Sequence, residues 1–162
     1  MTSNNVWPYK FSKNGMDSFG LEGRISFSHY DRDGRLVEEL DIPNTITNGG
    51  LAQTAGLLNG VVTNFFEYIA IGTGTTAAAA SQTALVAEAT RSTAAASRIT
   101  TTKTNDTAQL LHTFSFVAGS AITESSIQDA ATEGTMLSRQ TFNPINVSSG
   151  DTLAVTWKVQ AS

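Results

Sequence analysis

One glycine-rich segment has the spacing of a known chemical site. Gly72-Thr73-Gly74-Thr75-Thr76-Ala77 fits the pattern G-x-G-x-x-[G/A], in which backbone amides at a helix start hold a dinucleotide pyrophosphate. That site also needs a βαβ unit and an acidic residue about 20 positions further on. Glu88 is roughly placed, but antiparallel strands are predicted to follow. We therefore interpret Gly72 and Gly74 as positive-φ turn residues and predict no cofactor.

Nucleophilic or acid–base catalysis would depend on the only two histidines, His29 and His112. A catalytic Ser or Thr needs such a base beside it, and the chain contains no G-x-S-x-G elbow. Both histidines lie within predicted strands. His112 shares a face with bulky apolar residues such as Phe114, which favours a hydrogen-bonded core histidine. We predict no catalytic residue and no enzymatic activity.

The acidic residues offer little for metal binding or paired-carboxylate catalysis. Asp31-Arg32-Asp33-Gly34 resembles the start of a calcium loop but lacks the remaining oxygen ligands and the final Glu. Asp-Gly is typical of a tight hairpin, and we favour that interpretation. Glu38 and Glu39 point to opposite sides of a strand, so they and Glu22 are predicted to be solvated surface. No metal site is predicted.

The composition excludes several classes of protein. The 162 residues are 40% hydrophobic and 15% charged, which suits one folded domain rather than a disordered chain. The net charge of −4 gives no electrostatic footprint for nucleic acid or an anionic membrane. No apolar run reaches the roughly 18 residues of a membrane helix, and there is no cysteine for disulfides or metal ligation. The polar amino terminus predicts a protein made in a cytosol.

The elements that must position these residues begin after an irregular aromatic segment. Residues 1–20 show neither helical nor strand periodicity, yet they are too aromatic for a free tail. We predict an extended arm that docks on its own domain or on a neighbouring subunit. The candidate subunit contacts are Trp7, Tyr9, Phe11 and Phe19.

A hairpin and one helix are predicted next. Alternating residues from Leu21, with Ile25 and Phe27 on one face, and the segment from 36 to 42 form the two hairpin strands. The segment 47–60 carries helical spacing between a Thr47 or Asn48 cap and a terminal Gly60. Residues 65–71 then form a strand.

The rest of the chain predicts a long loop and a series of strands. Residues 76–97 are rich in Ala, Ser and Thr and are expected to form a surface loop with one helical turn at 85–89. Strands are expected at 99–103, 110–117, 122–128, 135–142 (ended by Pro144) and 153–159. The predicted fold is mainly β: an arm, residues 1–20, and an antiparallel β-sandwich or jelly-roll-like domain, residues 21–162.

Three segments together resemble a known group of proteins. They are Asn44 to Ala52; Tyr68 to Thr76 followed by Leu85, Glu88 and Arg91; and Ile122 to Glu124 with Gly134 to Phe142 and Gly150 to Val159. Their order and spacing are similar to those of small virion proteins of tailed bacteriophages, described as tail, fibre-like or head-decoration proteins. Ser125-Ser126 stands where that group usually has a Gly. Residues 1–20 lie outside the resemblance.

The resemblance implies a non-enzymatic virion structural protein that is assembled in the host cytoplasm. Head decoration, or cement, is the role we favour, with the major capsid protein as partner and self-association of the chain. A tail adaptor or fibre-proximal tail protein that contacts other tail proteins is the alternative. A carbohydrate-binding β-sandwich for host attachment is a third. The group implies no catalytic residues, so none is assigned here.

Overall fold

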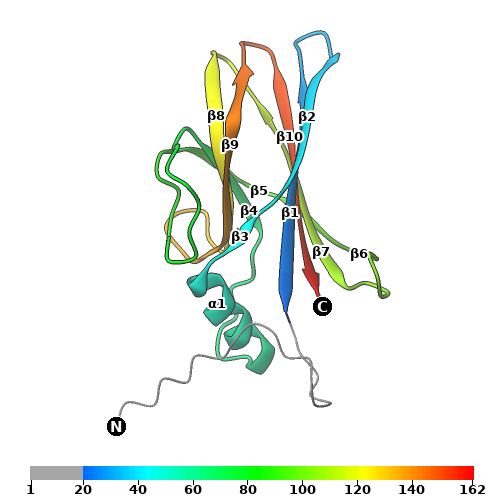
Figure 1. Ribbon diagram of the computed structural model, residues 1–162, viewed down its shortest axis with the longest axis vertical. Coiled ribbons are helices and arrows are strands. Elements are labelled where there is room, and N and C mark those ends of the chain that lie inside the picture. The colour runs from blue at the N-terminus through cyan, green and yellow to red at the C-terminus, as the bar shows by residue number, and fades with distance from the viewer. Residues whose placement is uncertain (1–19) are drawn as a thin grey trace.

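The computed structural model describes residues 20–162, which form two antiparallel five-stranded sheets packed face to face (Figure 1). The first sheet has the order β2-β1-β10-β7-β6 and the second the order β3-β9-β8-β4-β5. The prediction of a mainly β sandwich with one helix is confirmed. The predicted arm, with Trp7, Tyr9, Phe11 and Phe19, lies outside the described residues apart from Gly20.

The first sheet contains the two strands that follow the alternation in the sequence most closely, β1 and β10. It consists of β1 (Leu21–Tyr30), β2 (Leu36–Pro43), β6 (Ala95–Ile99), β7 (Thr107–Ser115) and β10 (Thr152–Ala161). Strand β10 is central, and its alternate residues from Leu153 to Val159 are buried. Gly20 and Ser162 bond each other through both backbone amides, at 2.8 and 3.0 Å, where β1 begins and β10 ends.

The second sheet carries the helix at one end. It consists of β3 (Thr45–Ile46), β4 (Tyr68–Gly72), β5 (Glu88–Thr93), β8 (Ser120–Gln128) and β9 (Met136–Val147). Helix α1 (Asn48–Asn59) is capped by the Thr47 hydroxyl, which accepts from Gly50 N at 2.9 Å, and ends at Gly60 with φ 73°. Both predicted ends of the helix are confirmed.

One apolar core lies between the sheets. Its largest fully buried members include Trp157, Phe27 and Leu153 of the first sheet and Ile71 and Ile145 of the second. The Trp157 indole donates to Ser125 Oγ at 3.2 Å and so joins the two sheets by a polar contact inside the core.

The predicted surface loop at 76–97 is partly wrong. The chain is irregular only as far as Ala87; residues 88–93 form β5 beside β4, and 95–99 form β6 beside β7. The predicted helical turn at 85–89 does not form. Both strands lie at sheet edges with mostly exposed residues, so neither has the apolar alternation by which a strand is recognised.

The predicted strand at 99–103 is wrong beyond Ile99, the last residue of β6, because the chain turns from Thr100 onward. The Asp106 carboxylate accepts from the backbone amides of Thr101, Thr102 and Lys103 at 2.8–2.9 Å. These bonds, that of Lys103 foremost, hold the pKa of Asp106 far below its ordinary value despite the opposing effect of desolvation. A carboxylate that gathers three successive amides favours a tight turn over an extended strand.

Several strand limits also differ from the prediction, and β7 covers residues 107–115 rather than 110–117. Strand β4 begins at Tyr68, three residues later than predicted. Strand β9 does not end before Pro144 but continues to Val147. Ile122 pairs with Ile145 and Glu124 with Thr141, so β9 bulges between these positions. A bulge tolerates a residue that lacks an amide hydrogen.

Candidate functional site

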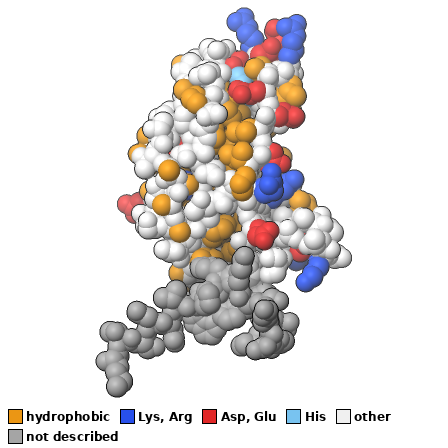
Figure 2. Space-filling model, viewed as in Figure 1, with side chains coloured by type: hydrophobic (Ala, Val, Ile, Leu, Met, Phe, Trp, Pro, Cys, Tyr) orange, Lys and Arg blue, Asp and Glu red, His pale blue; other side chains and the backbone are white. Residues whose placement is uncertain are grey.

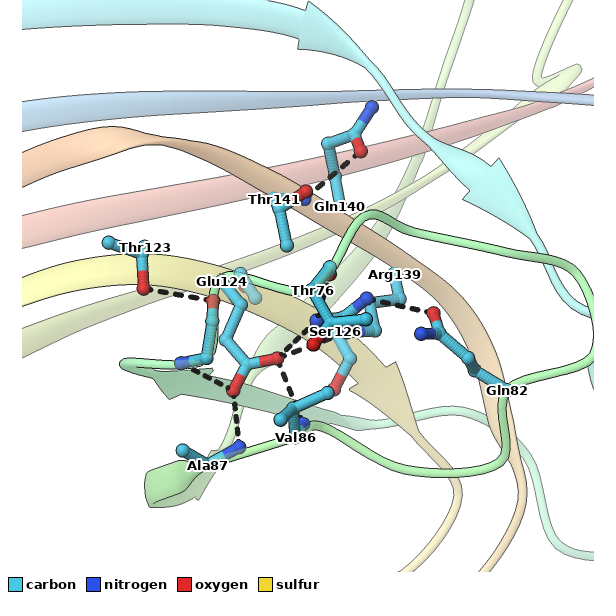
Figure 3. A network of polar contacts seen from close by, with 12 residues as sticks. Thr76, Gln82, Val86, Ala87, Thr123, Glu124, Ser126, Arg139, Gln140 and Thr141 are labelled. Atoms are coloured by element: carbon cyan, nitrogen blue, oxygen red, sulfur yellow. Dashed lines mark hydrogen bonds and ion pairs between the residues drawn. The ribbon is translucent and has the colours of Figure 1, made fainter.

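The most extensive buried polar network lies where the segment 73–87 covers the second sheet (Figure 3). Glu124 of β8 and Arg139 of β9 form its centre, and both side chains are fully buried. Adjacent antiparallel strands bring them together, with Arg139 Nη2 2.7 Å from Glu124 Oε2. Because an isolated buried charge is very unfavourable, the pair needs further partners.

Those partners come from both ends of the covering segment. Glu124 Oε1 accepts from Gly74 N at 3.0 Å and Ala87 N at 2.7 Å, and Oε2 accepts from Val86 N at 3.0 Å. Arg139 adds a second bond to Oε2 from Nε at 3.0 Å. Five donors therefore converge on one carboxylate, and three of them belong to the segment's backbone.

Arg139 holds the middle of the same segment. Its Nη1 donates to Gln82 Oε1 at 2.8 Å, and its Nη2 donates to the Thr76 carbonyl at 2.9 Å. Gln82 in turn accepts from Ala79 N at 2.9 Å. The ion pair is thus a clamp that fixes an otherwise irregular stretch to the sheet.

The two glycines are needed at this clamp for a reason that differs from our prediction. Gly72 and Gly74 do not have positive φ; among residues 20–162 the positive-φ glycines are Gly34, Gly60, Gly134 and Gly150. A Cβ on Gly74 would lie 2.4 Å from Glu124 Oε1, and one on Gly72 would lie 2.3 Å from the Ala87 carbonyl oxygen. The G-x-G spacing therefore leaves room for a carboxylate inside the protein.

The hydrogen bonds decide the ionisation state of Glu124. Burial alone raises the pKa of this carboxyl, but the bonds from Ala87 N–H, the Arg139 guanidinium, Val86 N–H and Gly74 N–H outweigh it and lower the pKa. A carboxylate with five donors is poorly suited to accept a proton. The chemistry of this arrangement is that of a fixed structural anion.

Glu88 and Arg91 form a second tie in the same region. Arg91 binds both oxygens of Glu88, at 3.0 and 2.8 Å. Its Nη1 also donates to the carbonyls of Ala130 and Glu133, each at 2.8 Å. Arg91 therefore anchors β5 to the 130–133 turn, and Glu88 holds Arg91 in place, whereas the dinucleotide pattern would have placed Glu88 on a ribose.

The buried histidine is His29 rather than His112. His29 Nε2 lies 2.9 Å from Asp151 Oδ2, and its Nδ1 lies 3.6 Å from Glu38 Oε1. The bond from His29 is the main reason that the pKa of Asp151 is lowered. His112 is half-buried and stacks edge-on against Phe114, with the ring centres 4.6 Å apart, so its predicted place in the core is wrong.

The remaining acidic candidates are engaged as turn or surface groups. Asp31 Oδ1 accepts from Asp33 N and Arg35 N, each at 2.9 Å, and Gly34 has φ 78°, so the hairpin interpretation is confirmed. Glu38 and Glu39 face opposite sides as predicted, toward His29 and Ser28. Within residues 20–162 no cluster of three or more acidic or histidine side chains could hold a metal ion. The α1 helix, the one helix in that part of the chain, is too short to cross a membrane.

Sequence reasoning missed the clamp, although a signal for it was present. Glu124 and Arg139 are opposite charges inside two neighbouring strands of a chain that is only 15% charged. Each lies within a few residues of buried apolar side chains such as Ile122 and Leu137. Such charges are seldom fully buried unless they are paired. What the sequence did not reveal was that residues 73–87 would cover them.

No family model matches the chain, and neither the curated proteins nor the solved structures contain a match.

Proposed function

We propose that this protein is a non-enzymatic structural component of a tailed-bacteriophage virion, and within the virion a head decoration protein. One observation carries the proposal. Four charged residues of the resembling segments, Glu88, Arg91, Glu124 and Arg139, bind one another or the nearby backbone and so hold the second sheet and its covering segment together. A structural virion protein would depend on such residues to hold its fold together.

The framework suits a passive mechanical role. Two sheets share one core, and the buried clamp fixes the longest irregular segment between strands to them. A decoration protein acts by bridging capsid subunits and resisting the pressure of packaged DNA. Rigidity in the bridging body serves that role directly.

An exposed apolar surface near the end of α1 supports contact with a neighbour. Leu58, Val61 and Phe65 are 75%, 80% and 60% exposed. Apolar side chains so close in sequence and so exposed favour burial against another protein. In the proposed role, that protein is a capsid subunit or another copy of this chain.

Carbohydrate binding has less support than a structural role. Sugar-binding surfaces use exposed aromatic rings, and Phe65 is the one aromatic side chain classed as exposed among residues 20–162. The other aromatic side chains of these residues are half-buried or buried, which gives a sugar-binding platform less support.

The test uses virions of the phage that encodes the chain. Heads and tails are separated, and the protein is sought in each by mass spectrometry. We expect it in heads, and we expect virions lacking it to lose DNA on heating or at low salt. Its presence in tails, with normal heads and missing or incomplete tails in its absence, would instead support the tail-adaptor alternative.

A further inference from the structure

A partly apolar groove runs between the two sheets along one side of the molecule. Leu40 and Ile42 of β2 line one wall, and Thr141, Phe142 and Asn143 of β9 line the other. Its volume is about 370 Å³. Hydrophobic side chains are visible as a band along this side in Figure 2. Leu40, Ile42 and Phe142 are only half-buried, so the core is incompletely covered here.

The groove is bordered by strands with unpaired edges. Among residues 20–162, strand β2 is the last strand of its sheet and pairs only with β1. On the other wall, and within the same residues, β3 pairs with β9 only at Ser138 and Arg139, so β9 from Gln140 onward pairs with β8 alone. An exposed strand edge next to apolar side chains is the usual receptor for an added extended segment.

The two faces of β2 carry different side chains, and this difference determines which kind of sequence could pair with the strand. Leu40 and Ile42 point inward, whereas Glu39 and Asp41 point outward between them. The strand carries three acidic residues and no basic one. A fitting segment is therefore one with apolar residues at every second position and a basic residue between them.

We propose that residues 7–11 of the same chain occupy this groove as an added strand beside β2. Trp7, Tyr9 and Phe11 alternate, so in an extended segment their rings share one face. That face suits the apolar side chains of the groove, which are those of Leu40, Ile42, Pro43 and Phe142. Lys10 then lies on the outer face, where Glu39 and Asp41 are. Pro8, which lacks an amide hydrogen, is tolerated in a strand at a sheet edge.

The length of the chain before Gly20 permits this placement. Residues 12–19 span about 26 Å when extended. Ile42 pairs with Ile25, which is five residues beyond Gly20 and therefore about 17 Å along β1. The length of residues 12–19 that exceeds this distance is enough for the chain to pass around the edge of β2. A tethered segment has an effective concentration in the millimolar range, which favours the chain's own arm over that of a second copy.

The absence of cysteine from the chain allows a direct test with the full-length protein. The double variant Lys10→Cys/Asp41→Cys places thiols on neighbouring strands at a spacing compatible with a disulfide, and Lys10→Cys/Glu39→Cys samples the adjacent register. Lys10→Cys/Thr113→Cys is the matched control, because Thr113 is exposed on β7, away from the groove. Products are mapped by mass spectrometry under mild oxidation.

We expect an intramolecular disulfide to form on the order of tenfold faster in one of the β2 variants than in the control. Adding Trp7→Ala and Phe11→Ala should remove most of that difference while circular dichroism shows an intact body. Equal rates in all pairs, or disulfides found only in dimers, would overturn the proposal. Because the isolated protein is used, the result is independent of whether the chain belongs to a virion.

Discussion

At the scale of single residues, the Glu124–Arg139 pair shows how a buried charge is made tolerable. Desolvation opposes both ions, and their mutual attraction alone rarely compensates for it. Here the carboxylate has five hydrogen-bond donors, and the guanidinium also binds Gln82 and the Thr76 carbonyl. The hydrogen bonds, more than the ion pair itself, therefore determine whether the burial of these two charges is tolerated.

Replacing Glu124 by Gln should strongly destabilise the fold. The change removes the charge that balances Arg139 and places an amide donor among existing donors, so we expect a loss of about 3–5 kcal/mol in the free energy of unfolding. Urea denaturation measures this loss. Glu39→Gln, on the exposed strand β2, is the control and should change stability by less than about 0.5 kcal/mol. A similar small effect for Glu124→Gln would contradict the clamp.

The same residue predicts how stability depends on pH. The pKa of Glu124 is lowered on folding from its ordinary value of 4.5. A lowered pKa adds stability that is fully present above that ordinary value and is lost as the pH falls through the folded-state pKa. The stability difference between the native chain and Glu124→Gln should therefore be constant from about pH 7 to 5 and shrink below about pH 4.5. Urea titrations of both proteins across this range test the claim; an unchanged difference in acid would refute it.

At the scale of elements, the placement of the segment 73–87 depends on the space that Gly74 leaves free rather than on unusual backbone angles. Gly74 does not have a positive φ, but a Cβ at this position would lie 2.4 Å from Glu124 Oε1 and 2.7 Å from the Val86 Cβ. The position therefore selects glycine by contact distance.

Gly74→Ala should lower the free energy of unfolding by about 1–3 kcal/mol, because the new methyl group would overpack the clamp. Gly119→Ala is a close control, since its Cβ would meet only the Val147 carbonyl oxygen, at 3.5 Å, and its φ is not positive. Denaturation curves give both values, and hydrogen exchange at Val86 and Ala87 should accelerate only in Gly74→Ala. Equal effects of the two substitutions would mean that the close approach has little importance.

The elements that could be predicted from the sequence are those with one buried face. Strands β1 and β10 alternate clearly, and α1 has a cap at Thr47 and a stop at Gly60. Strands β5 and β6 could not be found in this way, because as exposed edges they depend on pairing with β4 and β7. The turn at 100–106 depends on one carboxylate, that of Asp106, which overrides the strand preference of Thr. The clamp likewise depends on contacts between residues far apart in the chain.

At the scale of the whole molecule, the core and one buried hydrogen bond join the two sheets into one unit. Trp157 belongs to the first sheet and Ser125 to the second, and the indole N–H donates across the core at 3.2 Å. Ser125 Oγ in turn donates to the Ala70 carbonyl at 2.8 Å. A sandwich joined in this way should unfold as a single cooperative unit.

Trp157→Phe tests this link between the sheets. It removes the hydrogen bond and leaves a small cavity, so we expect a loss of about 1–3 kcal/mol in the free energy of unfolding. Near- and far-ultraviolet circular dichroism should still report one coincident transition. Leu111→Ala, at a 40% exposed position of β7, serves as the reference and should cost less. Separate transitions for the two signals would show that the sheets unfold independently.

The paired backbone bonds between Gly20 and Ser162 have a practical consequence for engineering the chain. A cargo fused after Ser162 would leave the body at the point where residues 1–19 enter it, while the Asp31–Gly34 hairpin lies at the opposite end (Figure 1). A short linker from Ser162 to Gly20 would therefore close the chain into a ring without stretching it. Opening that ring between Arg32 and Asp33 would give a circular permutant that retains every strand pairing. Its new ends would lie at the end of the molecule opposite Gly20 and Ser162.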